Sequence, residues 1–276
     1  MRYLIISMVL AGGIFSLFNG VYAQQQQTGA PIQTLKMATT TSVENSGLIY
    51  VLVPPFEEKF NIKVDVIAVG SGKALKLAEN GDVDIVFVHS PEAENKFITS
   101  GFGVNRRSVM YNDFVIVGPA DDPAGISGES APKAFRKIAD KKSPFTSRGD
   151  ESGTHNKEGE IWAIAGIQPK GTWYLKTGEG MENTLQMADQ KEAYCLVDRG
   201  TYIANEDKVE LVILNEGDSR LNNPYSIIAV NPARHPDVNY IYSMAFIGEI
   251  TSPEGQNLIG GLKKDGRALF NPSSYK

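Results

Sequence analysis

The sequence predicts an α/β fold of two lobes that are joined by two crossover strands. In the first hundred residues short apolar runs alternate with helical patterns, which is typical of a parallel sheet covered by helices. Two later segments, 112–119 and 224–232, have the same form: each is an apolar strand that ends in Gly-Pro or Asn-Pro. We interpret them as the strands that leave the first lobe and return to it. A single continuous domain with two ordinary core strands is the alternative.

The expected elements of the first lobe follow in a regular order. They are a strand at 34–39, a helix around 48–56, a strand at 62–69, a short helix at 73–79 and a strand at 83–88. Pro54 and Pro55 predict a kink or an end of the first helix. The second lobe is expected to hold a strand at 173–176, a helix at 182–189 and a strand at 210–214, and the stretch 237–262 is expected to be helical and to cover the first lobe.

These patterns divide the chain into four parts. We assign residues 34–115 and 226–276 to the first lobe and residues 116–225 to the second, after a signal peptide at 1–23 and a flexible tail at 24–33. Arg2 precedes an apolar stretch that is too short to span a bilayer, and the small-x-small sequence ending at Ala23 follows it. The pattern predicts cleavage after Ala23 and export to the periplasm.

Composition and charge exclude several classes of protein. The chain is 42% hydrophobic and 21% charged, which is typical of a globular fold. Its net charge of −5 argues against a nucleic-acid partner. Cys195 is the lone cysteine and is expected to be buried, and the three histidines show no CxxC or HExxH spacing. We therefore expect no metal cation and no cofactor.

The first donor cluster is the run Thr39, Thr40, Thr41 and Ser42, which follows the first expected strand. Thr41 fits a capping box with Glu44, so a helix is expected to begin beside the hydroxyls. Free amides at a helix start stabilise an anion, and each hydroxyl can donate one further hydrogen bond. An ordinary helix cap is the alternative.

The second cluster is Gly70-Ser71-Gly72-Lys73, after the second strand. It lacks the first glycine of a P-loop and the third glycine of a dinucleotide fingerprint. The glycines on both sides of Ser71 would let a ligand approach the backbone amides closely. Because ligands bind beyond the carboxyl ends of parallel strands, this cluster and the first should share one edge of the sheet. A plain tight turn is the alternative.

The third cluster lies at 147–155, before another expected helix. Arg148 offers a fixed fork of donors that suits a multivalent oxyanion, and Ser152, Gly153 and Thr154 add hydroxyls and amides at the helix start. The alternative is an exposed loop in which Asp150 or Glu151 neutralises Arg148. Three donor-bearing helix starts together predict an oxyanion site.

A catalytic interpretation of this third cluster is disfavoured. Ser152, His155 and Asp150 are too close in sequence to adopt triad geometry easily, and the local pattern is GxxSG instead of the GxSxG of a nucleophile elbow. We expect no catalytic residues, and a serine hydrolase remains only a remote alternative.

The segments 39–42, 70–75 and 147–155 resemble the motifs of tungstate-binding proteins of ABC importers, and the similarity extends through 84–91, 194–202 and 224–232. The resemblance implies a type II periplasmic binding fold that closes over tungstate or molybdate and delivers it, as a monomer, to a membrane permease with an ATP-hydrolysing subunit. The ligand-holding positions that it implies are Thr39 to Ser42, Ser71, Arg148 and Ser152 to Thr154.

Two questions stay open at this point. The resemblance does not fix which threonine hydroxyl faces the anion, and we favour Thr40 and Thr41. A phosphate- or sulfate-binding transport protein is the alternative, because phosphate-binding relatives carry a similar Arg-x-Asp-x-Ser-Gly-Thr segment. Hydrogenphosphate needs an acceptor for its proton, and Asp150 or Glu151 would serve if either pointed inward.

Overall fold

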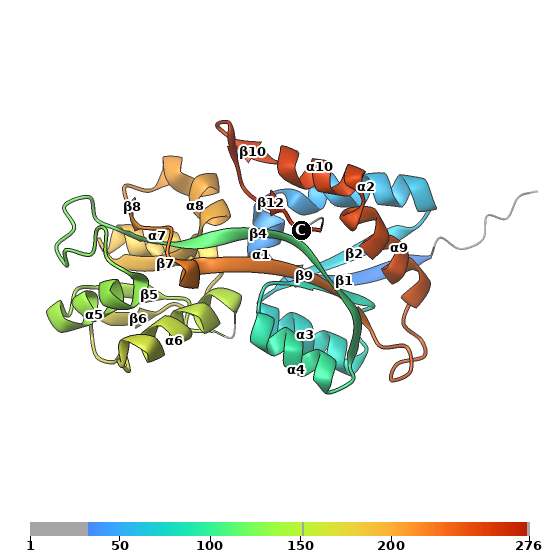
Figure 1. Cartoon of the computed structure of the whole chain (residues 1–276), viewed down its shortest axis with the longest axis horizontal. Helices are drawn as coiled ribbons and strands as arrows, with labels where there is room; N and C mark the ends of the chain where they lie inside the picture. The colour runs from blue at the N-terminus through green and yellow to red at the C-terminus, as the bar shows by residue number, and fades with distance from the viewer. Residues whose placement is uncertain (1–32, 151, 275–276) are drawn as a thin grey trace, which may run out of the picture. The chain divides into compact units, whose positions relative to one another are not determined.

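The computed structural model describes residues 33–150 and 152–274 (Figure 1). The expected signal peptide at 1–23, and the tail up to residue 32, lie outside the described residues. The strands form a ten-stranded mixed sheet in the order β2-β1-β3-β9-β4-β7-β5-β6, in which β8 and β12 also pair with β4. The predicted α/β class is confirmed.

The first group of elements comes from the first hundred residues and is built around three parallel strands. It consists of β1 (Thr34–Thr40), α1 (Thr41–Asn45), α2 (Leu48–Phe60), β2 (Lys63–Val69), α3 (Ser71–Asn80), β3 (Ile85–Val88) and α4 (Pro91–Thr99). β1 lies between β2 and β3 and pairs with both in parallel. All four residues of β3 are buried, as expected for a strand covered on both faces.

Pro54 and Pro55 were expected to kink or end the first helix, but α2 does not end at them. The helix begins after Gly47, whose φ is +83°, and continues through Pro54 and Pro55 to Phe60. Its buried face holds it in place: the Phe56 ring packs edge-on against Phe246 at 4.9 Å between centroids. Tertiary packing of this face offsets the backbone hydrogen bonds that the prolines remove.

Two long strands connect the first group to the rest of the chain. β4 (Gly103–Gly118) and β9 (Asn222–Val230) pair with each other in antiparallel fashion, with Asn112 opposite Asn223. β4 also pairs with β7 (Tyr194–Asp198) and β8 (Val212–Asn215). Figure 1 shows β4 and β9 running from one group to the other. The predicted segment 112–119 covers only the last part of β4, because the polar residues at 105–108 concealed the earlier part of this strand, and the predicted segment 224–232 overlaps β9 with a shift of two residues.

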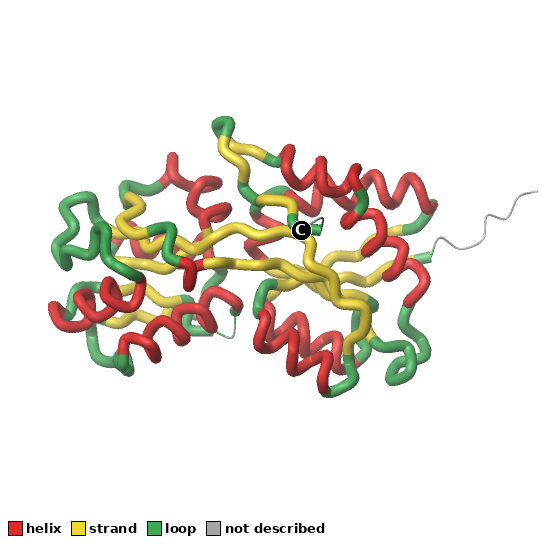
Figure 2. Tube along the Cα trace, in the orientation of Figure 1, coloured by secondary structure: helices red, strands yellow, loops and turns green. Residues whose placement is uncertain are grey.

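The second group contains the strands β5 to β8 with four α-helices. Its other elements are α5 (Ala131–Lys141), β5 (Phe145–Ser147), α6 (Gly153–Ala165), β6 (Tyr174–Lys176), α7 (Met181–Gln190), α8 (Arg199–Asn205) and the short 3-10 turns η1 (Glu206–Lys208) and η2 (Ser219–Leu221). β5 pairs in parallel with β6 and β7. Figure 2 shows helices flanking the strands in both groups.

The end of the chain returns to the first group. It forms α9 (Tyr240–Thr251), α10 (Pro253–Gly261), β10 (Lys263–Lys264), β11 (Arg267–Ala268) and β12 (Asn271–Pro272). The expected helical stretch is therefore two helices, separated where Ser252 caps the second one. None of the helices in the described parts of the chain is long and apolar enough to cross a membrane.

The apolar core is continuous between the two groups. One cluster of buried side chains contains Leu52 and Phe56 of α2 together with Leu185 of α7, Val197 of β7 and Ile203 of α8. A second cluster lies within the second group around Phe145, and a third lies beneath α3 and α4. Separate cores therefore do not define the boundaries of the expected lobes.

Candidate oxyanion-binding site

The hydroxyl run and the glycine-flanked serine end at the same edge of the sheet. β1 and β2 are parallel neighbours, and Thr40 is aligned with Val69 at their carboxyl ends. The turn after β2 touches the third predicted segment, because a Cβ atom on Gly70 would lie 3.5 Å from the Cα of Ser152.

The third segment also reaches the hydroxyl run through the loop before α7. The N–H of Gly178 donates to the carbonyl of Arg148 at 2.8 Å. Two residues later, a Cβ atom on Gly180 would lie 3.9 Å from the Thr41 hydroxyl oxygen. The fold therefore brings together all three clusters that the sequence singled out.

Part of the hydroxyl run is committed to the protein itself. The Thr39 hydroxyl donates to the carbonyl of Phe87 at 2.9 Å. The Thr40 and Ser42 hydroxyls bond each other at 3.0 Å, and Thr40 also accepts from the N–H of Val43 at 3.4 Å. These three side chains hold the turn after β1 in shape.

The cap of α1 differs from the expectation. Thr40, and not Thr41, is the N-cap residue, because the extended backbone of β1 continues through Thr40 with φ −96° and ψ 150°. Thr41 is therefore the first residue of a helix of five residues. This shift of one residue frees the Thr41 hydroxyl from capping.

Three buried polar atoms of the predicted residues have no partner within the described protein. They are Oγ1 of Thr41, Oγ of Ser71 and Nε of Arg148. Ser71 is 0% exposed and Arg148 is 5% exposed. Leaving a buried donor without an acceptor costs about 1–3 kcal/mol, and native proteins do so rarely. A ligand that carries several acceptor oxygens would satisfy these groups.

Two helices begin at the same place. Ser71 is the first residue of α3, whose cap residue Gly70 provides no side-chain bond. α6 begins at Gly153, where the Ser152 hydroxyl accepts from the N–H of His155 at 3.2 Å, and Thr154 is buried in its first turn. The first N–H groups of a helix have no acceptor within it and carry partial positive charge. Both helices therefore present their positive ends to this region.

Asp150 orients the arginine of the site. Its carboxylate accepts from Nη2 of Arg148 at 2.6 Å and from the N–H of Ser152 at 3.1 Å. Burial raises the pKa of Asp150, but the hydrogen bonds from Ser152 and the charge of Arg148 outweigh burial, so the pKa lies below its ordinary value. Asp150 is thus a carboxylate whose two oxygens are already engaged. Glu151, the other residue in question, lies outside the described residues.

His89 is a residue of this region that the sequence patterns did not single out. A Cβ atom on Gly153 would lie 2.8 Å from the His89 ring and from its carbonyl oxygen. The ring stacks on Tyr225 at 4.6 Å between centroids, and its Nδ1 bonds Oδ1 of Asn223 at 2.8 Å. Burial lowers the pKa of His89 although the charge of Asp198 opposes this, which favours the neutral imidazole. The sequence signal that could have identified His89 is its position directly after β3, at the edge of the sheet where the other clusters lie.

The side chains proposed for a catalytic triad do not adopt one. The Ser152 hydroxyl bonds the backbone of His155, and the imidazole Nδ1 of His155 lies 3.2 Å from the hydroxyl of Ser147. Asp150 contacts Arg148 and the backbone of Ser152. Within residues 33–150 and 152–274, no group of three or more His, Cys, Asp or Glu side chains is placed to hold a metal ion.

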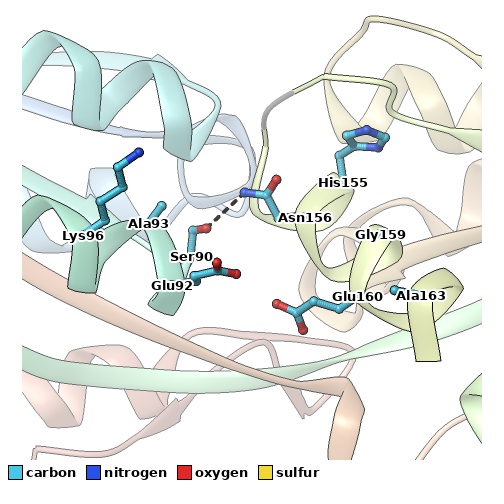
Figure 3. A pocket seen from close by; sticks show the side chains of 9 residues that line it. All are labelled: Ser90, Glu92, Ala93, Lys96, His155, Asn156, Gly159, Glu160 and Ala163. Carbon is cyan, nitrogen blue, oxygen red and sulfur yellow. Dashed lines mark hydrogen bonds between the residues drawn. The ribbon is translucent and has the colours of Figure 1, made fainter.

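A cleft of about 610 Å³ lies beside the site, between α4 and α6 (Figure 3). It is lined by Ser90, Glu92, Ala93, Lys96, His155, Asn156, Gly159, Glu160 and Ala163. The cleft does not include Thr41, Ser71 or Arg148, so it marks the rim between the two groups and not the position of the unpartnered donors.

The fold and its donor-lined edge define the type II periplasmic binding fold. A model of the PBP superfamily domain matches residues 24–254. Tungstate-binding protein TupA of Peptoclostridium acidaminophilum is 40% identical, over 99% of this chain and 99% of that protein. TupA of Campylobacter jejuni is 44% identical over 83% and 87% of the two chains. The structure of the tungstate ABC transporter protein from Geobacter sulfurreducens is 55% identical, covers 83% of this chain and 98% of its own, and superposes with a TM-score of 0.75. The chain therefore belongs to the PBP superfamily and, within it, to the family of tungstate-binding protein TupA.

Proposed function

We propose that this protein captures tungstate, with molybdate as the close competitor, and delivers it to an ABC importer. The observation that carries the proposal is the set of unpartnered buried donors on Thr41, Ser71 and Arg148. They come from three separate segments, and each can donate to a different oxygen of one tetrahedral anion. The relatives that bear the tungstate-binding name support the same ligand.

Thr39, Thr40 and Ser42 have a supporting role in this proposal. Their hydroxyls are bonded within the protein, so they shape the turn that presents Thr41. The Ser152 hydroxyl bonds the carboxylate of Asp150 and accepts from the N–H of His155, so it shapes the start of α6, where the N–H groups of Gly153 and Thr154 stand. This set consists of donors, which favours a fully deprotonated anion, and both carboxylate oxygens of Asp150 are already bonded to Arg148 and Ser152.

Capture is proposed to involve closure of two lobes. We assign residues 34–115 and 226–276 to the first lobe and 116–225 to the second, with β4 and β9 as the hinge strands. The anion docks on Thr41 and Ser71 of the first lobe, and the second lobe then brings Arg148 and the start of α6 to it. Closure removes water, which strengthens the charge-assisted bonds.

No covalent step is part of this proposal, and no cofactor is required. The partners are a membrane permease and its ATP-hydrolysing subunit, which would recognise the closed form of a monomer. The protein would reach the periplasm through cleavage of residues 1–23, and sequencing the amino terminus of the exported protein tests this.

Calorimetric titration of the purified protein with tungstate, molybdate, sulfate and phosphate tests the ligand. We expect tight one-to-one binding of tungstate, comparable or weaker binding of molybdate, and much weaker binding of sulfate and phosphate. Tight phosphate binding without any response to tungstate would overturn the proposal in favour of a phosphate transport protein.

The arginine can be tested with a matched control. Arg148→Ala removes a charge-assisted bond worth about 1.5–3 kcal/mol, so tungstate affinity should fall at least about tenfold. Arg220 also pairs with the aspartate two residues away in sequence, but its side chain is 48% exposed and lies outside the site. Arg220→Ala should therefore bind tungstate normally. Equal affinities of the two variants would remove Arg148 from the site.

A further inference from the structure

One side-chain hydrogen bond crosses the cleft beside the site (Figure 3). Nδ2 of Asn156, in the first turn of α6, donates to the hydroxyl of Ser90 at 3.1 Å. Ser90 immediately precedes α4, so the bond joins the second group of elements to the first. Figure 3 shows the two side chains pointing toward each other across the rim of the cleft.

Both ends of this bond are held firmly by their own helices. The N–H of Ser90 donates to Oε1 of Glu94 at 2.7 Å, and the N–H of Asn156 donates to the carbonyl of Ser152 at 2.9 Å. The Ser90 hydroxyl makes no capping bond in α4. Its contact with Asn156 is therefore not needed to build either helix.

The bond is also directly linked to the anion donors. Asn156 follows Ser152, Gly153 and Thr154 within one turn of α6, and Ser90 follows His89, against which Gly153 packs. Any separation of α6 from the first group that releases the anion must break the Asn156–Ser90 bond.

We infer that Asn156 and Ser90 form a latch that holds the two lobes together over the oxyanion and sets how long it stays bound. The inference rests on the proposed function. The latch forms only after α6 has approached the first lobe, so it should slow dissociation and leave the association rate unchanged. Asn156 and Ser90 are thus positioning residues that need not touch the anion.

The latch should differ from the charged groups around it in its response to ionic strength. Glu92 of α4 and Glu160 of α6 line the same cleft, and Glu160 pairs with Lys157 at 2.6 Å. The latch itself joins a neutral amide to a neutral hydroxyl. Salt screens interactions between exposed charges but affects a neutral bond little. The contribution of the latch to dissociation should therefore be nearly the same at low and high ionic strength.

Stopped-flow measurement of tungstate dissociation tests the latch, with the intrinsic fluorescence of Trp162 and Trp173 as the signal. We expect Asn156→Ala and Ser90→Ala each to raise the dissociation rate about 2- to 10-fold, the usual effect of losing one net hydrogen bond. The double variant should release the anion no faster than the faster single variant, because both changes remove the same bond. Association rates should stay at the wild-type value.

Asn95→Ala is the matched control. Asn95 is also an exposed asparagine of the cleft-lining helices, but its side chain bonds Arg106 at 2.7 Å within the first group and does not cross to α6. Its variant should release tungstate at the wild-type rate. Wild-type dissociation rates in both latch variants, or additive effects in the double variant, would overturn the latch alone. If the wild-type protein bound none of the oxyanions, the proposed function and the latch would both fall.

Discussion

Replacing Ser71 by alanine should have opposite effects on folding and on binding. The Ser71 side chain is 0% exposed, and its hydroxyl has no partner within the described protein. A buried hydroxyl without a partner costs about 1–3 kcal/mol, so its removal should leave the ligand-free protein equally stable or more stable. The same hydroxyl is proposed to donate to a charged ligand, a bond worth about 1.5–3 kcal/mol. Ser71→Ala should therefore weaken tungstate binding about 10- to 150-fold.

Ser243→Ala provides the matched control for this experiment. Ser243 is also 0% exposed, but its hydroxyl contacts the carbonyl oxygens of Asp84 at 3.1 Å and Asn239 at 2.9 Å. Its loss should lower the free energy of unfolding by about 1 kcal/mol and leave tungstate affinity unchanged. Urea unfolding without ligand and calorimetric titration measure the two effects. If Ser71→Ala destabilises the ligand-free protein as Ser243→Ala does and binds tungstate normally, the Ser71 hydroxyl is not a ligand group.

Two further predictions follow from the contacts around α6. Gly153→Ala places a Cβ atom 2.8 Å from the ring and the carbonyl of His89. Because overpacking costs about 1–3 kcal/mol, the tungstate affinity of this variant should fall about 5- to 150-fold. Gly159→Ala, in the same helix with nothing within 4 Å of the added Cβ atom, should bind tungstate normally, and equal titration curves for the two variants would contradict the steric argument. Asp150→Asn should lower stability at neutral pH, because the pKa of Asp150 lies below its ordinary value of 3.8 in the folded protein. The stabilisation by ionised Asp150 is complete above pH 3.8 and is lost as the pH falls through the lower pKa of the folded protein. The urea midpoints of wild type and variant should therefore converge in acid. A constant difference between the two midpoints would show that protonation of Asp150 is not involved.

Most of the fold could be predicted because its elements carry strong local signals. The continuous apolar run at 85–88 and the alternating one at 63–69 are strands within two residues of the prediction. Pro54 and Pro55 do not end α2, because the packing of Phe56 against Phe246 stabilises the helix beyond them. The start of β4 was also missed. This part of β4 is partly exposed and pairs with β9, which is distant in the chain, so its sequence carries little local pattern.

The candidate site was predicted as a set of segments, but not as a set of atoms. Thr40 was favoured as a contact to the anion, and its hydroxyl is bonded to Ser42 and to the backbone of Val43. Only Thr41 of the run keeps a buried hydroxyl without a partner. The predicted cap residue, Thr41, and the observed one, Thr40, are adjacent in the chain. The spacing of residues in the sequence does not distinguish between two adjacent cap positions.

The sequence alone determined the α/β class and the three donor clusters, because strand and helix periodicity and helix-start chemistry are local properties of the chain. The tertiary structure decided which of those donors are buried without partners. It also placed His89, Asn156 and Ser90 beside these donors. These contacts join residues that are far apart in the chain. Their formation depends on how β4 and β9 hold the two groups together, and no local pattern encodes that arrangement.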